Sequence, residues 1–223
     1  MNVLGLDTST AASAACVLRA DGREFEALPA FEELGAAPAH SRDLLVRVTG
    51  VMDAAGLGFH QLDAVAVGTG PGSFTGLRVG IATARALAAA HDLELRPVSS
   101  LAALAAGIDA EERLPLIDAR RGEVFAALHD GDGERWAPFA APPDQVAERV
   151  RVEGGNPLAA GDGSLRFRGL LEAAGVSVAP DGSQVHVVRA LHVCRLAIAA
   201  PSVAPEAVLP TYIREPDATP STP

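Results

Sequence analysis

Two aspartates that directly follow apolar segments are the first candidates for chemistry in this sequence. Asp7 comes after Val3-Leu4-Gly5-Leu6 and begins the polar stretch Asp7-Thr8-Ser9-Thr10, and Asp118 comes after Leu114-Pro115-Leu116-Ile117. Two carboxylates at strand ends that face one cleft would suit an enzyme that uses magnesium-bound ATP. The alternative is that each aspartate only caps a turn by accepting hydrogen bonds from its own backbone. The turn is the commoner use of aspartate at such positions.

A glycine-rich segment between an apolar run and a helical pattern is the second candidate. Glycines stand at positions 68, 70, 72 and 76, after Ala64-Val65-Ala66-Val67. A junction of this kind can leave amide N–H groups free to hold an anion. Standard phosphate motifs do not fit, because the chain has no lysine for a Walker loop and the glycine spacing breaks the dinucleotide motif. The spacing also excludes a G-x-S-x-G nucleophile elbow. The sequence therefore predicts a phosphate or nucleotide site, or the remnant of one, formed by Asp7, Thr8, Gly70, Gly72, Ser73 and Asp118.

Small residues recur every fourth position in the helix predicted after this segment. Gly76, Gly80, Ala84 and Ala88 therefore lie in one row along the helix. Each glycine inside a helix costs about 1 kcal/mol relative to alanine, so a compensating close contact is expected. Either the protein's own sheet or a partner helix could make that contact, and the residues alone leave both open.

Composition and spacing exclude several classes of function. The six histidines include no H-x-x-x-H pair, so a helical two-histidine metal site is not predicted. Cys16 and Cys194 lie in apolar surroundings and are expected to be buried thiols. A net charge of −10 argues against unaided binding to nucleic acid. No apolar run is long enough to span a membrane and no secretory signal begins the chain, which favours a cytoplasmic protein.

The pattern of apolar residues predicts the elements that position these candidates. Residues 3–6, 13–19 and 24–28 are expected to form a β-meander, and a helix capped by Ser41 is expected to end at Gly56. The glycine segment, a strand at 95–99 and a short helix at 101–106 complete a first unit. The pattern then begins again at residue 114, and Asp7 and Asp118 stand at the same distance before the turn residues Asp21 and Asp132. Two related units are therefore predicted.

The second unit has weaker signals. Helices are expected at 143–150, 165–174 and 185–200, with a short strand at 158–161. We predict a first lobe at residues 1–106, a second lobe at 107–214, and a disordered tail at 215–223.

Several motifs run in order along nearly the whole chain. They are Asp7-Thr8-Ser9-Thr10, His40-Ser41 with Leu44-Leu45, Gly70-Pro71-Gly72-Ser73-Phe74-Thr75-Gly76-Leu77-Arg78, Ser99-Ser100-Leu101, Asp118-Ala119-Arg120-Arg121-Gly122 and Pro210-Thr211-Tyr212-Ile213-Arg214. Together they resemble the TsaB (YeaZ-type) family, whose members serve in making N6-threonylcarbamoyladenosine in transfer RNA. Residues 141–200 match this family weakly.

The resemblance implies an α/β actin-like, hexokinase-type (ASKHA) fold with two related lobes, each built on a βββαβα-type unit. It also implies a noncatalytic subunit that binds the catalytic paralogue TsaD, with the ATPase TsaE in the same assembly. The chain would then need no cofactor or metal of its own, ATP would act at the partner subunits, and transfer RNA would be reached only through the complex.

The family is expected to pair with TsaD through its first two helices, or with itself as a homodimer when TsaD is absent. The corresponding contact residues here are His40, Ser41, Leu44, Leu45, Val48, Val51, Gly76, Gly80, Ala84 and Ala88. A Gly80→Arg substitution is then expected to block pairing and leave the monomer folded. The alternative function is an independent ATPase or phosphotransferase that uses Asp7 and Asp118. A peptidase is not supported, because the sequence offers no suitable set of metal ligands.

Overall fold

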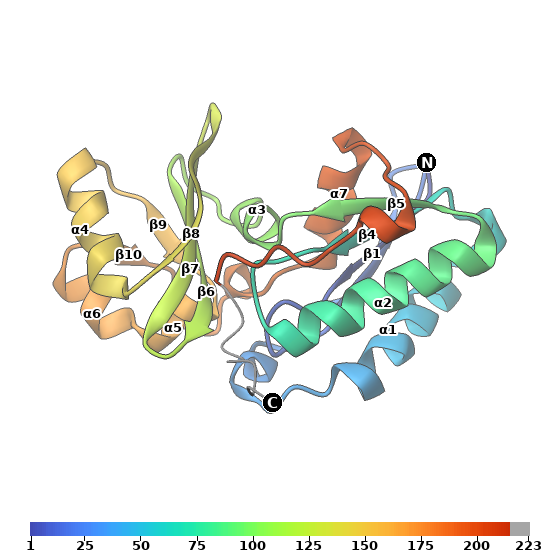
Figure 1. Cartoon of the computed structure of the whole chain (residues 1–223), viewed down its shortest axis with the longest axis horizontal. Helices are drawn as coiled ribbons and strands as arrows, with labels where there is room; N and C mark the ends of the chain where they lie inside the picture. Colours follow the sequence, from blue (N-terminus) through green and yellow to red (C-terminus); the bar gives the residue numbers. More distant parts are fainter. Residues whose placement is uncertain (215–223) are drawn as a thin grey trace, which may run out of the picture.

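Two five-stranded sheets organise the computed structural model, which describes residues 1–214 (Figure 1). The first contains β1 (Val3–Asp7), β2 (Ala14–Leu18), β3 (Glu24–Ala27), β4 (Ala64–Gly68) and β5 (Glu94–Val98), in the order β3-β2-β1-β4-β5. The second contains β6 (Arg113–Arg120), β7 (Glu123–Asp130), β8 (Gly133–Ala141), β9 (Leu158–Ala160) and β10 (Ser177–Val178), in the order β10-β9-β6-β7-β8. Starting from its other edge, the second sheet has the order β8-β7-β6-β9-β10, so β6 takes the place that β1 has in the first sheet. The two sheets therefore have the same topology, which confirms the predicted repeat. Asp7 in β1 and Asp118 in β6 lie on equivalent strands.

The first lobe has two long helices on one face of its sheet. α1 (His40–Ala55) and α2 (Phe74–His91) pack with the sheet around a core that includes Leu44, Val48 and Ala84. The predicted bounds of α2 are confirmed, and Ser73 caps this helix by accepting a hydrogen bond from the Gly76 N–H at 3.3 Å. The predicted Ser41 cap is wrong, because α1 already begins at His40 and follows Ala39, which has no side-chain acceptor.

The second lobe differs from its prediction in detail. α4 (Pro143–Glu153) lies where a helix was predicted, but the predicted helix at 165–174 is two short helices, α5 (Asp162–Arg166) and α6 (Arg168–Ala173), separated at Phe167. The strands β8 and β10 were not predicted. β8 is an edge strand in which only Trp136 and Ala141 are buried, so it lacks a regular alternation of apolar residues.

The last helix of each half packs against the sheet of the other half. α3 (Ser100–Ala105) contacts β6 and β7, whereas α7 (Ala190–Ala199) packs on β1 and β2, and the two helices contact each other. They form a joint core between the lobes that includes Val3, Cys16, Leu101, Ile117, Phe125 and Leu191. The predicted division at residue 106 falls between α3 and β6, but α7 lies on the first sheet and so is not part of a second lobe at 107–214.

A C-terminal strap, residues 203–214, follows α7 and runs along the first lobe toward the second (Figure 1). The Val203 N–H donates to the Leu95 carbonyl at 2.9 Å, and Val208 is buried in the core of the first lobe. The predicted disordered tail at 215–223 lies outside the described residues. Within residues 1–214, no helix is both long and apolar enough to cross a membrane.

Candidate functional site

The residues of the β1–β2 loop fill the space beside the glycine segment. A Cβ added at Gly68, Gly72, Gly76 or Gly80 would come within 3.0 Å of Asp7, Ser9, Thr8 and Thr8, respectively. At Gly72 and Gly76 the nearest atom is a backbone carbonyl oxygen, which cannot rotate away as a side chain can. Glycine is therefore needed at positions 72 and 76 for close contact with Thr8 and Ser9 of the same chain, and glycine at 68 and 80 leaves room for the side chains of Asp7 and Thr8.

Three amides of the glycine segment are already bonded within the chain. The Gly70 N–H donates to Ser100 Oγ at 3.1 Å, the Ser73 N–H to the Ser9 carbonyl at 2.7 Å, and the Gly76 N–H to Ser73 Oγ. An anion could bind these three groups only if the loop rearranged. These three groups therefore do not form a phosphate cradle in the observed arrangement.

Asp7 is bonded to its own surroundings and is 1% exposed. Its Oδ1 accepts from the Ser9 N–H at 2.8 Å and from Ser9 Oγ at 2.6 Å, and its Oδ2 accepts from Ser100 Oγ at 2.7 Å. Burial raises the pKa of Asp7, although these hydrogen bonds oppose the shift. The geometry is that of a capped turn, and it holds β1 against α3.

Asp118 makes the same turn in the second lobe, but it faces the space between the lobes. Its Oδ1 accepts from the Arg120 N–H at 2.9 Å, and its Oδ2 pairs with Arg120 at 3.2 Å and Arg166 at 3.3 Å. Arg120, Arg121 and Gly122 all have positive φ angles, which turns the chain sharply between β6 and β7.

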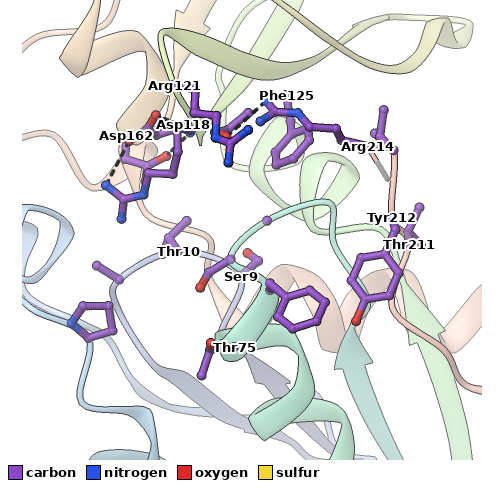
Figure 2. A pocket seen from close by; sticks show the side chains of 18 residues that line it. Ser9, Thr10, Thr75, Asp118, Arg121, Phe125, Asp162, Thr211, Tyr212 and Arg214 are labelled. Atoms are coloured by element: carbon purple, nitrogen blue, oxygen red, sulfur yellow. Dashed lines mark hydrogen bonds and ion pairs between the residues drawn. The ribbon is translucent and has the colours of Figure 1, made fainter. Parts of the chain in front are cut away.

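A cavity of about 480 Å³ lies between the two lobes (Figure 2). Its walls include Ser9, Thr10, Gly72, Ser73 and Thr75 of the first lobe, Asp118, Arg121 and Asp162 of the second, and Tyr212 and Arg214 of the strap. Of the predicted phosphate residues, Gly72, Ser73 and Asp118 reach this cavity. Asp7, Thr8 and Gly70 do not line it and are buried.

Comparisons with known proteins agree with this architecture. A family model described as "TsaD: tRNA N6-adenosine threonylcarbamoyltransferase" matches residues 34–203. The chain is similar to a tRNA threonylcarbamoyladenosine biosynthesis protein TsaB from Escherichia coli, with 31% identity over 96% of this chain and 95% of that protein. The chain belongs to the TsaB (YeaZ-type) family. A second TsaB, from Haemophilus influenzae, is 38% identical over 56% of this chain, and the match spans about half (52%) of that protein.

Solved structures support the assignment to the TsaB family. YeaZ from Pseudomonas aeruginosa superposes with a TM-score of 0.77 at 30% sequence identity, covering 95% of this chain and 99% of that one. The ethanolamine utilization protein EutJ from Carboxydothermus hydrogenoformans has a TM-score of 0.51 at 14% identity, covering 87% of this chain and 90% of that one, and shows the fold alone. The predicted two-lobed ASKHA-type fold is thus confirmed.

Most of the contact residues predicted for this TsaB-family chain face its own core. His40, Leu44, Val48, Val51, Gly76, Gly80, Ala84 and Ala88 are all buried, and only Ser41 and Leu45 are exposed. The assignment of the eight buried residues to an exposed contact surface is wrong for this chain, because their row faces the sheet and the β1–β2 loop. The outward sides of the same helices carry other apolar residues, including Val46 at 67% exposure.

His40 illustrates this difference. Its Nδ1 lies 2.8 Å from Ser13 Oγ, its Nε2 is buried without a hydrogen-bond partner, and the ring packs beside Gly76. Burial lowers the pKa of His40, although Asp43 opposes the shift. The ring therefore links the start of α1 to the β1–β2 loop and is inaccessible to a partner.

We predict that this chain loses stability in mild acid. Burial lowers the pKa of His40, His129, His186 and His192, so their contribution to stability is complete above the unfolded pKa of about 6.5 and is lost as the pH falls. Below about pH 6.5, a histidine that stays neutral in the folded state becomes protonated in the unfolded state. Each such histidine lowers the free energy of unfolding by about 1.4 kcal/mol per pH unit. Urea unfolding between about pH 7.5 and about pH 5.5 measures the slope. His192→Gln should reduce it and the exposed His60→Gln should not; equal slopes in the native chain and in His192→Gln would contradict the prediction.

Sequence patterns did not single out Asp162, which begins α5 on the wall of the cavity. Its Oδ1 accepts from the Asp118 N–H at 3.0 Å. Burial raises the pKa of Asp162 to about 6, and the charge of Asp118 adds to the shift, whereas backbone hydrogen bonds oppose it. In the sequence, Asp162 follows a short predicted strand that ends at Gly161, and neither feature points to a carboxyl group with a raised pKa.

Asp162→Asn is expected to stabilise the protein at alkaline pH. The folded state takes up a proton on Asp162 between about pH 4 and 6, so the ionised carboxylate reduces stability above that range. Asparagine carries no charge and its Oδ1 can still accept from the Asp118 N–H. We expect a gain of about 1 to 2 kcal/mol at pH 8 that disappears below about pH 4. Urea unfolding at both pH values tests this, with the exposed Asp132→Asn as the matched control; an equal gain at both pH values would contradict it.

Proposed function

We propose that this chain is a noncatalytic subunit that binds and positions a TsaD-type threonylcarbamoyltransferase in the synthesis of N6-threonylcarbamoyladenosine in transfer RNA. A TsaE-type ATPase joins the assembly, ATP acts at the partner subunits, and the chain reaches transfer RNA only through the complex, in the cytoplasm. The observation that carries the proposal is the filling of the glycine segment by residues 7–9. The elements that could hold a phosphate instead stabilise the first lobe.

The proposed contact surface is the outward side of α1 and α2. Ser41, Leu45, Val46 and Thr49 are exposed on α1, and Arg78 and Ala82 are exposed on α2. Leu45 and Val46 are 53% and 67% exposed. Full burial of each aliphatic side chain would contribute about 1.5 to 3 kcal/mol, so a few such contacts are enough for a specific pairing. In the absence of TsaD, the same surface would pair with a second copy.

Reconstitution tests the proposed role. This chain is combined with TsaD, TsaE, ATP, threonylcarbamoyl-adenylate and transfer RNA, and each protein is omitted in turn while modified nucleoside is measured. We expect product formation to need this chain, and Asp118→Asn and Arg121→Ala variants to retain activity within about twofold. Loss of product by either variant in an intact complex would assign chemistry to this chain and contradict the proposal.

The cavity between the lobes favours one alternative, an independent ATP-binding phosphotransferase or ATPase. Asp118 and Arg121 line the cavity beside the start of α2, where a phosphate group could be held by charge. Calorimetric titration of the purified chain with magnesium and ATP separates the two functions. We expect no tight binding; tight binding that is lost on Asp118→Asn would favour the enzyme.

A further inference from the structure

The C-terminal strap crosses from one lobe to the other beside the cavity. The Thr211 N–H donates to the carbonyl of Thr69, the residue after β4, at 2.7 Å. The Tyr212 ring stacks on Phe74 with 5.4 Å between centroids, and the Tyr212 hydroxyl oxygen accepts from Arg78 Nε at 3.2 Å. Residues 211 and 212 are therefore attached to the first lobe.

The next two residues of the strap reach the second lobe. Ile213 packs against the joint core, which contains residues of both sheets. Arg214 Nη2 donates to the Ala119 carbonyl at 3.3 Å and forms an ion pair with Glu123. Ala119 and Glu123 lie on the two sides of the β6–β7 turn, so Arg214 contacts both strands of this hairpin. Figure 2 shows Tyr212 beside the first lobe and Arg214 beside the second, along one side of the cavity.

We propose that residues 211–214 form an interlobe lock that fixes the angle between the lobes and thereby the width of the cavity. In two-lobed proteins, closure is a rigid-body rotation that depends on a few connecting residues. The joint core connects the lobes through α3 and α7, the Phe31 ring of the first lobe contacts the His186 ring of the second with 6.0 Å between centroids, and the strap adds a further connection beside the cavity. Rotation about the joint core would separate Arg214 from Glu123 or Thr211 from Thr69.

The contacts also indicate that the lock can be released. The Arg214 and Glu123 side chains are 28% and 33% exposed, and a partly exposed ion pair is weak by itself. The lock depends on the combination of this pair, the Thr211 hydrogen bond, the Tyr212 stack and the partial burial of Ile213. Removal of the Arg214 side chain should therefore loosen the lobes without unfolding either of them.

Distances between spin labels on the two lobes test the lock in the isolated full-length chain, independently of the proposed function. Ala20→Cys in the turn after β2 and Ala173→Cys on α6 place labels at exposed positions away from the outward side of α1 and α2, whereas the native Cys16 and Cys194 are buried. We expect a single narrow distance distribution for the labelled protein. Arg214→Ala should broaden it about twofold, and Tyr212→Ala combined with Arg214→Ala should broaden it further.

Two matched variants control for loss of an arginine. Arg151 pairs with Glu148 inside α4, so Arg151→Ala removes an ion pair that does not join the lobes and should leave the distribution unchanged. Arg214→Lys keeps the charge and should restore part of the narrow distribution. Cooperative thermal unfolding of each variant confirms that it is folded. An unchanged distribution in both Arg214→Ala and the double variant, or equal broadening by Arg151→Ala, would overturn the proposal.

Discussion

Replacing Gly76 by alanine is expected to destabilise the first lobe severely. The new Cβ would come within 3.0 Å of the Thr8 carbonyl oxygen, a backbone atom held inside the β1–β2 loop. The better helix propensity of alanine returns only about 1 kcal/mol, whereas forced movement of a packed loop costs more. We expect a net loss of about 3 kcal/mol in the free energy of unfolding, measured by urea denaturation.

Gly50 provides a matched control for this substitution. It lies inside α1, is exposed, and has no atom within 4 Å of an added Cβ. Gly50→Ala should therefore stabilise the protein by about 0.5 to 1 kcal/mol. Equal stabilities of the Gly76→Ala and Gly50→Ala variants would show that α2 does not need glycine for its contact with residues 7–9.

The same contact changes the interpretation of Gly80→Arg. The sequence predicts that this variant loses its partner and stays folded, but a Cβ at Gly80 would come within 3.0 Å of Thr8 Oγ1. An arginine side chain there would have to separate α2 from the β1–β2 loop. Loss of partner binding by this variant would then report unfolding, so an interface must be tested with exposed residues.

Val46→Glu is expected to weaken binding of a TsaD-type partner by about a hundredfold and to leave stability within about 0.5 kcal/mol. The side chain is 67% exposed on α1, so the isolated chain tolerates a charge there. In the proposed interface, the carboxylate would be buried without a partner, which is strongly unfavourable. Titration calorimetry with the catalytic subunit measures the change in affinity.

Val152→Glu on α4 is a close control, because it replaces the same residue type on a helix at 68% exposure. This variant should bind the partner with native affinity. If both substitutions weaken binding equally, or if Val46→Glu binds within about twofold of the native chain, then the outward side of α1 is not the contact surface.

The sequence predicted the helical row of small residues but not the side that the row faces. Spacing by four places Gly76, Gly80, Ala84 and Ala88 together on one face of α2 in any structure. A loop that connects two strands of the protein's own sheet and a helix of a partner both require small residues for close approach. The periodicity of small residues therefore cannot distinguish the two contacts. The same holds for the apolar stripe of α1, whose members fill the core of the first lobe.

The second half was harder to predict because its signals are short or irregular. β8 has Gly133 at its start and Pro138 within it, and most of its side chains are at least partly exposed at the sheet edge. These features are typical of edge strands but also of loops. The repeat itself was predicted correctly from β6 and β7, whose apolar residues are almost all buried.

α3 and α7 each pack on the sheet of the other half of the chain, and this arrangement has a consequence for biosynthesis. All five strands of the first sheet leave the ribosome early, but the helix that covers Val3, Cys16 and Ala66 is made only after the entire second sheet. Until then, this apolar side of the nascent sheet is exposed to solvent or to chaperones. Translation products that stop before α7 therefore cannot complete the first lobe and would be substrates for cellular proteases.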